Sequence, residues 1–196
     1  MTRFRETLVP GPGVQKIPHL AAYLPECASL RFGVAPTGAT DSVIGWGFKP
    51  TARYARELAA RKGLTYLALE DGFLRSVELG EAGAPPVSLI ADDLGVYYDA
   101  RLPSRLETLL QDGGWETPEL LARAQAALDR MVALGLGKTN SAPPLAPGGL
   151  GPRGRRRVLV IDQTFGDAAI EGGLADASSF EAMLAIQLEA EGLLAG

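Results

Sequence analysis

The stretch Val158-Leu-Val-Ile-Asp-Gln-Thr-Phe-Gly-Asp167 joins an apolar run to a polar turn, and the fold prediction starts from it. Residues 158–161 are four consecutive apolar residues, the pattern of a strand that is buried on both faces of a parallel sheet. Asp162 follows at the carboxyl end of that strand, where open α/β sheets bind ligands. Asp167 follows Gly166, on a turn whose backbone can approach a bound molecule closely. The stretch therefore predicts a βα unit with a carboxylate at each end of a binding turn; the alternative is a strand followed by a solvated loop.

The composition is that of a soluble globular protein, and it excludes several functional classes. Of 196 residues, 46% are apolar and 21% are charged, and the formal net charge of -4 gives no electrostatic basis for nucleic-acid binding. Cys27 is the only cysteine and His19 the only histidine, which excludes a disulfide framework and a multi-histidine metal site. The sequence shows neither a signal peptide nor an apolar run long enough for a membrane span, so a cytoplasmic protein is expected.

Segments of strand and helix character alternate between residues 14 and 141 and predict an α/β lobe with a mainly parallel sheet. The last expected helix is the best marked, because Thr117 can cap it and Pro118 suits its first turn. Residues 1–13 form a polar start that closes in Pro-Gly-Pro-Gly, and they are expected to be poorly ordered. The expected strands are 30–34, 42–46, 65–69, 87–91 and 94–98, and the expected helices are 51–62, 103–111 and 117–134.

Residues 142–157 are rich in proline, glycine and arginine and predict a linker. Its arginines are expected to be solvated, with contact to anionic lipid headgroups as the functional alternative. The remaining residues, 158–196, contain the opening strand and a helix that begins near Ser178. One strand and one helix cannot enclose a core. This segment is therefore expected to be either the last βα unit of the first sheet or the start of a second, incomplete lobe.

A second acidic turn follows the strand expected at residues 65–69. Glu70 and Asp71 are adjacent carboxylates, and Arg75 lies four residues after the second of them. Two carboxylates at a strand end can divide acid and base roles if their surroundings push their pKa values apart. The structural alternative is a turn in which Gly72 supplies positive φ and Arg75 pairs with Glu70.

Two further polar clusters allow both a binding and a structural interpretation. Asp92 and Asp93 suggest a divalent cation or a helix cap, whereas a tight turn between strands needs no ligand. Asn140 lies just after Lys138 at the end of the long helix, where it can contact phosphate; a cation at a helix C-terminus is the ordinary explanation of this cluster. Neither a Walker-type loop nor a GxGxxG motif after a strand is present.

Six segments carry a resemblance to a known family. They are Ile17-Pro-His-Leu20, Trp46-Gly-Phe-Lys-Pro50, Leu69-Glu-Asp-Gly-Phe-Leu-Arg-Ser76, Pro85-Pro-Val-Ser-Leu89, Asp92-Asp-Leu-Gly-Val-Tyr-Tyr-Asp99 and Val160-Ile-Asp-Gln-Thr-Phe-Gly-Asp167. In their order and spacing, these segments closely resemble the capsular polysaccharide β-Kdo transferase family of Gram-negative bacteria. Each segment alone is a weak signal, but the ordered set is specific.

The resemblance implies a two-lobed GT-B-type glycosyltransferase with a Rossmann-type N-terminal lobe, which transfers Kdo from CMP-Kdo with retention of configuration. Retention in the family resembles a double displacement through an aspartate, and the residue that matches here is Asp167. The anomeric carbon leaves CMP through an oxocarbenium-like state that a carboxylate can trap. We predict that Glu70 or Asp71 accepts the proton of the acceptor hydroxyl, and that Arg75 neutralises an anionic acceptor or the sugar carboxylate.

The resemblance also implies the binding partners. The donor is CMP-Kdo, without a metal or other cofactor, and the acceptor is a lipid-linked saccharide of phosphatidylglycerol type at the inner-membrane surface. Asp162, Gln163 and Asn140 are predicted substrate contacts. The protein is expected to be cytoplasmic, with peripheral association with the inner membrane and capsule assembly proteins as candidate partners, and to bind no nucleic acid.

The sequence departs from the family pattern where most donor contacts are made. It lacks a Lys-Val-His-Pro-type strand and a Ser/Gly-Phe-Glu-type turn, and it has Thr139-Asn140 where the family commonly has Tyr-Asn. We therefore expect an acceptor-side lobe over residues 14–141 and the first βα unit of a truncated donor-binding lobe over 158–196, inactive by itself. The alternative is a non-catalytic remnant or assembly module of the capsule export machinery. An aspartyl-phosphate enzyme built on Asp162 is a third, weaker hypothesis.

Overall fold

A computed structural model describes residues 4–76, 83–138, 143, 145–149, 160–161, 163–164 and 166–190. The chain divides into two compact units. Unit 1 comprises Met1–Tyr97 and Leu102–Ala142, and unit 2 comprises Tyr98–Arg101 and Pro143–Gly196. No helix in the described ranges combines the length and the apolar character that crossing a membrane requires.

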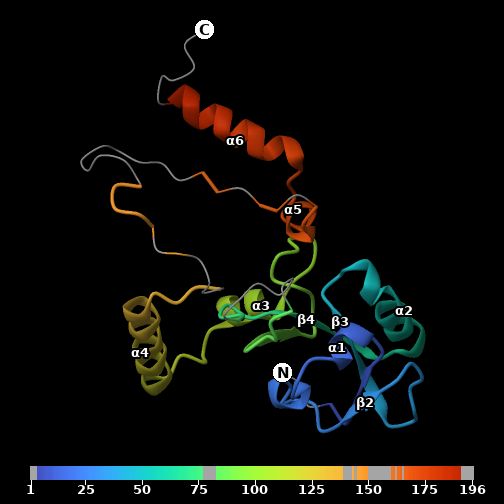
Figure 1. Ribbon diagram of the computed structural model, residues 1–196. Helices are drawn as coiled ribbons and strands as arrows, with labels where there is room; N and C mark the ends of the chain where they lie inside the picture. Colours follow the sequence, from blue (N-terminus) through green and yellow to red (C-terminus); the bar gives the residue numbers. More distant parts are fainter. Residues whose placement is uncertain are drawn as a thin grey trace. The chain divides into compact units, whose positions relative to one another are not determined.

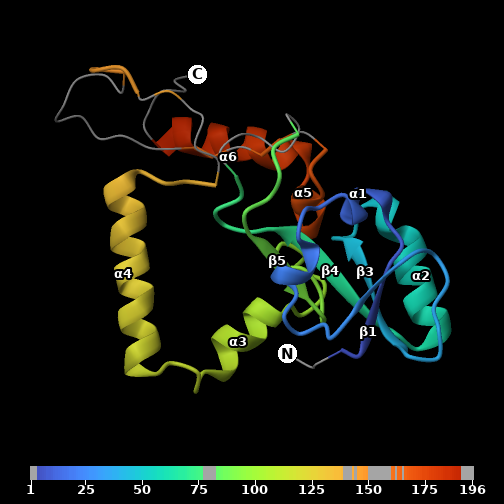
Figure 2. The same cartoon turned by 60° about the horizontal axis from the view of Figure 1, so that its bottom comes forward.

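The described part of unit 1 is built on one five-stranded sheet in the order β2-β1-β3-β4-β5 (Figures 1 and 2). The strands are β1 (Glu6–Val9), β2 (Leu30–Phe32), β3 (Thr40–Trp46), β4 (Thr65–Asp71) and β5 (Leu89–Asp92). The first four run parallel, and β5 pairs antiparallel with β4. This order is that of flavodoxin-like doubly wound sheets, which bind ligands where the strand order reverses. The predicted α/β lobe with a mainly parallel sheet is confirmed.

The helices of unit 1 begin and end where local signals place them. Gly63 ends α2 in the left-handed conformation, with φ of 63°. The side chains of Ser104 and Thr117 accept hydrogen bonds from backbone N–H groups in the first turns of α3 and α4. The elements are α1 (Pro12–Gln15), η1 (Leu20–Tyr23), η2 (Pro50–Ala52), α2 (Arg53–Lys62), α3 (Arg105–Asp112) and α4 (Pro118–Leu134).

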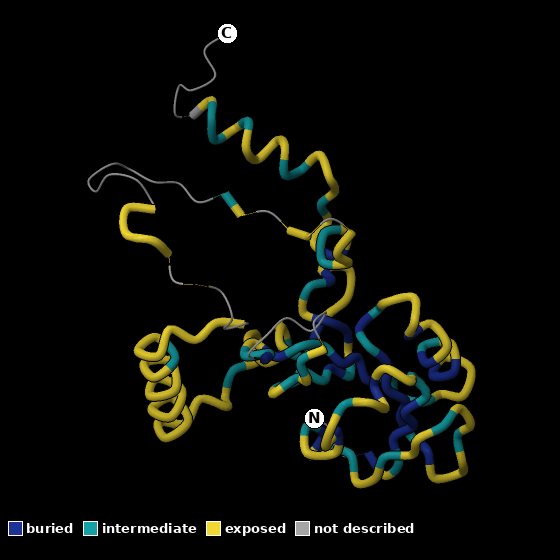
Figure 3. Tube along the Cα trace, in the orientation of Figure 1, coloured by how far each residue is buried: buried dark blue, intermediate teal, exposed yellow. Residues whose placement is uncertain are grey.

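The core of unit 1 covers both faces of the sheet, because successive strand residues point to opposite sides. Leu8 and Val43 face one side, where they pack with Leu58 of α2. Val9 and Ile44 face the other side and join the cluster formed by the segment after β1 and by β4. The buried positions gather in these strands and in α2, whereas α4 is exposed almost throughout (Figure 3).

The prediction that residues 1–13 are poorly ordered is wrong for the residues that the structure describes. Glu6–Val9 form β1, a central strand paired with β2 and β3. Leu8 and Val9 are fully buried. Thr7 is also fully buried, and its hydroxyl lies 2.7 Å from that of Ser42 on β3. The two hydroxyls satisfy each other, so a polar residue can occupy the middle of the sheet.

Two expected strands are not observed. Residues 94–98 form a turn instead, because the Asp92 carboxylate accepts hydrogen bonds from the N–H groups of Leu94 and Gly95 at 2.8 and 2.9 Å. Of the expected strand at 158–161, the structure describes Val160 and Ile161. Neither of these two residues lies in a strand, and Ile161 is 70% exposed; residues 158 and 159 lie outside the described ranges. In unit 2 the described helices are α5 (Ala168–Gly172) and α6 (Ala177–Ala190).

Candidate functional site

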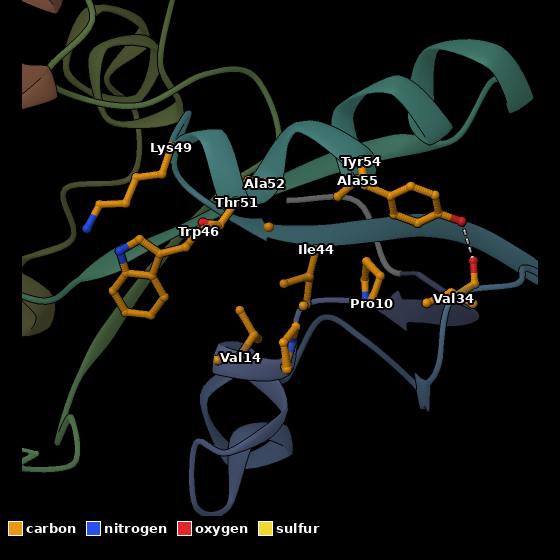
Figure 4. A pocket seen from close by; sticks show the side chains of 14 residues that line it. Pro10, Val14, Val34, Ile44, Trp46, Lys49, Thr51, Ala52, Tyr54 and Ala55 are labelled. Atoms are coloured by element: carbon orange, nitrogen blue, oxygen red, sulfur yellow. Dashed lines mark hydrogen bonds between the residues drawn. The ribbon is translucent and has the colours of Figure 1, made fainter.

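A cavity of about 670 Å³ opens at the carboxyl ends of β1 and β3. It lies where the strand order reverses, since β1 pairs with β2 on one side and with β3 on the other. Doubly wound sheets bind their ligands in this crevice. The lining residues are Pro10, Gly11, Pro12, Gly13, Val14, Val34, Ile44, Gly45, Trp46, Lys49, Thr51, Ala52, Tyr54 and Ala55 (Figure 4).

The sequence alone does not reveal this cavity, because its first wall is the Pro-Gly-Pro-Gly loop, whose composition predicts a poorly ordered start. The loop follows β1 directly, and Gln15 fastens it by donating a hydrogen bond to the Val9 carbonyl at 2.8 Å. A glycine-rich loop immediately after a short apolar stretch was the available signal. The predicted site residues that the structure describes all lie outside the cavity lining.

Gly45 sets the distance between β3 and the start of α2. A Cβ atom at this position would collide with the hydroxyl of Tyr66 and would lie 2.8 Å from the Cβ of Ala52. The Tyr66 hydroxyl donates to the Gly47 carbonyl, which fixes the turn after β3. Burial raises the pKa of Tyr66 to about 12, so this donor keeps its proton at neutral pH.

The two ends of the cavity differ in chemistry. Figure 4 shows Trp46 and Lys49 at one end, with both side chains directed to the same side, and Tyr54 and Val34 at the other. The Tyr54 hydroxyl donates to the Val34 carbonyl at 2.6 Å and so joins α2 to the segment after β2. Among the described lining residues Lys49 is the only charged one. The site is therefore an apolar chamber with a cation and an indole ring at one end.

The structure brings Asp71 and Arg75 together. Arg75 Nε lies 3.0 Å from an Asp71 oxygen, and Arg75 Nη1 donates to the Ser76 hydroxyl and to the Ala84 carbonyl, both at 2.7 Å. The expected pairing of Arg75 with Glu70 is replaced by this one, because Glu70 and Asp71 are successive residues of β4 and point to opposite faces. Arg75 is 11% exposed, so its contacts are mainly with the protein.

The suggested role of Gly72 is also corrected. Gly72 is absent from the described glycines with positive φ, so it is not required for a left-handed turn. It is required for close approach, since a Cβ atom there would collide with the hydroxyl and Cβ of Ser88. Glu70 and Asp71 lie within β4, opposite Ile90 and Leu89 of β5, and not in a turn.

Asp92 and Asp93 are explained by structural contacts. Asp92 accepts from the Arg105 backbone N–H at 2.7 Å in addition to its two bonds within the turn. Asp93 accepts from Arg105 Nε and Nη2, both at 2.9 Å, in a two-point ion pair. These contacts favour the interpretation of Asp92 and Asp93 as turn and helix-cap residues, and not as ligands of a divalent cation.

Asp167 belongs to unit 2, where it is the N-cap of α5. One of its oxygens accepts from the Ala169 N–H at 2.9 Å, and the residue is exposed. Gln163 is also described and exposed. Asp162 and Asn140 lie outside the described residues, so their predicted substrate contacts stay predictions, as does the catalytic role of Asp167.

The helix that Asp167 caps is fastened to the segment 98–101 of the same unit. The Ala100 N–H donates to the Gly172 carbonyl at 2.8 Å. Arg101 donates to both oxygens of Asp99 and, through Nη1, to Glu171, each at 2.8 Å. Hydrogen bonds from Arg101 hold the pKa of the buried Asp99 carboxyl below its usual value.

The chain is similar in sequence to proteins of capsule and lipopolysaccharide synthesis. The sequence profile of the family "Capsule polysaccharide biosynthesis protein" matches residues 41–131. The capsule polysaccharide modification protein LipA of Neisseria meningitidis serogroup B is 46% identical over 181 residues, which are 91% of this chain and 25% of LipA. The lipopolysaccharide-processing protein LpsZ of Rhizobium meliloti is 40% identical over 136 residues, 69% of this chain and 31% of LpsZ.

A solved structure has the same fold. The chain superposes on Thermosulfurimonas dismutans KpsC, described as a beta Kdo 2,4 transferase, with a TM-score of 0.86 and 43% identity. The match covers 98% of this chain and 59% of that chain. The chain therefore spans about a quarter of the length of LipA and somewhat more than half of the KpsC structure.

Proposed function

We propose that this chain belongs to the family of capsule polysaccharide biosynthesis proteins, whose profile matches residues 41–131, and that it is the acceptor-side part of a Kdo glycosyltransferase. The observation that carries the proposal is the match to the KpsC beta Kdo 2,4 transferase, at 43% identity over 98% of the chain. Identity at this level over nearly the whole chain supports related chemistry as well as a related fold. The donor in this proposal is CMP-Kdo, and the acceptor is a lipid-linked saccharide.

The proposed reaction has two displacements. In the first, the Asp167 carboxylate forms a bond to the anomeric carbon of Kdo while the bond to CMP breaks and its electron pair leaves with CMP. In the second, the acceptor oxygen attacks the same carbon, its proton passes to a base, and the bond to Asp167 breaks. Two inversions give net retention. The exposed carboxylate of Asp167, held by one cap hydrogen bond, is accessible for such a role.

We propose that the Glu70–Asp71 pair supplies the base, and that Asp71 also has a positioning role. An oxygen of Asp71 already accepts from Arg75 at 3.0 Å, and Arg75 in turn holds the Ala84 carbonyl. Asp71 and Arg75 therefore stabilise the segment after β4, with Glu70 on the opposite face of the strand. In the proposed reaction, Glu70→Gln and Asp71→Asn each slow transfer to the acceptor.

The test is a chimera, because the chain spans 25% of LipA. The matching region of LipA is replaced by this chain, and the product is incubated with CMP-Kdo and a Kdo-primed lipid analogue. Mass spectrometry counts the Kdo units added. We expect transfer by the chimera, and a loss of about 1,000-fold or more for Asp167→Ala.

Asp176→Ala is the matched control. Asp176 is also an exposed carboxylate that accepts from the N–H group at the start of a helix in unit 2, that of Ser179 at 3.1 Å. It lies outside the segments that carry the resemblance. Equal activity of Asp167→Ala and the parent chimera would overturn the nucleophile assignment. A folded chimera that transfers no Kdo would favour the alternative of a non-catalytic binding or assembly module.

A further inference from the structure

We propose that the cavity between β1 and β3 binds an anionic amphiphile, with its alkyl chain inside the chamber and its anionic group beside Lys49. The inference deepens the proposed function, because such a molecule corresponds to the lipid portion of the acceptor. Only this last identification rests on the proposed function. Binding itself follows from the cavity and is measured without any donor.

The lining favours an alkyl chain over a sugar. Apart from Thr51, Lys49 and three glycines, its walls are formed by aliphatic and aromatic side chains and by proline rings, among them Val14, Ile44 and Tyr54. The Tyr54 hydroxyl already donates its hydrogen bond to the Val34 carbonyl. A sugar carries a hydroxyl on most of its carbons, and each buried hydroxyl requires a hydrogen-bond partner. An alkyl chain requires none, and the volume lies within the range of about 300–1,000 Å³ of small-molecule sites.

The charge at one end selects an anion. Lys49 is exposed, and within the described ranges its ammonium group has no hydrogen bond or ion pair. The neighbouring cation, Arg56, is engaged differently: its guanidinium lies 5.5 Å from the centre of the Phe48 ring and donates to the Lys49 carbonyl at 3.2 Å. The Trp46 indole lies beside Lys49 (Figure 4), as an amphipathic ring at the boundary between an apolar chamber and water.

The chamber is held open by contacts that do not involve a ligand. Tyr54 ties one end to Val34, Gln15 fixes the loop after β1, and Gly45 allows α2 to approach β3. Little of the lining has to be ordered when a ligand enters, and preorganisation of this kind favours binding.

The test uses the 196-residue chain and n-alkyl phosphates of six, eight and ten carbons, below their micelle concentrations. The chain has two tryptophans, so Trp115→Phe leaves Trp46 as the fluorescent reporter inside the site. We expect saturable binding that strengthens about fourfold per added methylene until the chamber is full. Alkanoates of the same lengths distinguish a fatty-acid type of ligand from a phospholipid type.

Two variants and their matched controls distinguish the contribution of the ligand's alkyl chain from that of its anionic headgroup. Val34 lines the cavity and Val87 does not, yet both are 62% exposed. Val34→Asp should weaken binding at least about tenfold, and Val87→Asp should leave it unchanged. Lys49→Gln should weaken the binding of alkyl phosphates of every chain length by the same factor, up to about fivefold. Lys62→Gln, on the last turn of α2, should not weaken it.

The proposal is overturned if affinity does not change with chain length, or if Val34→Asp behaves like Val87→Asp. It is also overturned if free Kdo saturates the Trp46 signal more tightly than decyl phosphate does, since the site would then be a saccharide site. Amphiphile binding without Kdo transfer by the chimera would leave this inference standing and reject the proposed function. Kdo transfer by the chimera without amphiphile binding would support the proposed function and overturn this inference.

Discussion

The substitution Gly45→Ala tests how the cavity is built. The added methyl group would collide with the Tyr66 hydroxyl and would lie 2.8 Å from the Cβ of Ala52. Relief requires Tyr66 to leave the Gly47 carbonyl, a loss of about 1 kcal/mol, and α2 to move from β3, which costs about 1–3 kcal/mol as overpacking. The lower chain entropy of the unfolded alanine protein offsets about 0.4–1 kcal/mol. We expect a net loss of about 1–3.5 kcal/mol in the free energy of unfolding.

Urea denaturation followed by circular dichroism measures this loss. With a slope of about 2 kcal/mol per molar urea, the midpoint should fall by roughly 0.5–2 M. Gly38→Ala is the control: a Cβ atom there meets no atom within 4 Å, so its effect should stay within about 0.5 kcal/mol. Tyr66→Phe removes the closest contact, so Gly45→Ala should cost at least about 1 kcal/mol less in that background. Equal effects at Gly45 and Gly38, or strict additivity with Tyr66→Phe, would refute the geometry.

Four further predictions concern the sheet, the titrating groups and metal dependence. Thr7→Val should destabilise the chain by about 1–3 kcal/mol, because the buried Ser42 hydroxyl, 2.7 Å away, loses its partner; Ser42→Ala in addition should restore part of the loss in urea denaturation. Stability should decline above pH 10 and through pH 12, since the pKa of Tyr66 is raised from 10.0 to about 12 in the fold; Tyr66→Phe should flatten this decline. The pKa of Asp99 is lowered by Arg101, so the stability that ionised Asp99 contributes is complete above its ordinary pKa of 3.8 and is lost as the pH falls below that value. Asp99→Asn should remove this part of the loss of stability in acid, as measured by urea denaturation. Kdo transfer by the chimera should be unchanged by EDTA; loss of transfer, with recovery on adding a divalent cation, would contradict the expectation of no metal.

The elements that sequence reasoning found have strong local signals. The helix α4 was predicted at 117–134 from a capping threonine, a proline in the first turn and helical spacing, and it occupies Pro118–Leu134. The strands β3 and β4 contain the apolar stretches 43–46 and 66–69, and Gly63 marks the end of α2. In each case the determining interactions lie within one turn or one strand, so they are visible in the sequence.

The missed features depend on contacts between distant residues. β1 has four residues, and its Thr7 is buried only because Ser42 supplies a hydroxyl from β3. The turn at 94–98 is fixed by Asp92, whose carboxylate also holds the first residue of α3. The cavity requires the loop after β1, the end of β3 and the start of α2 to meet. None of these pairings has a periodicity that a single sequence can reveal.

The anchoring of α5 gives Asp167 a structural context that its own segment does not supply. Asp99 closes one of the segments that carry the family resemblance, and Asp167 closes another. Within unit 2, Arg101 holds Asp99 and reaches Glu171 at 2.8 Å, in the helix that Asp167 caps. Gly172 allows this approach, since a Cβ atom there would lie 2.7 Å from the Tyr98 carbonyl oxygen. A nucleophile must be held within a fraction of an ångström to react efficiently. In the proposed reaction, the residues around Asp99 would position the helix capped by Asp167, the proposed nucleophile.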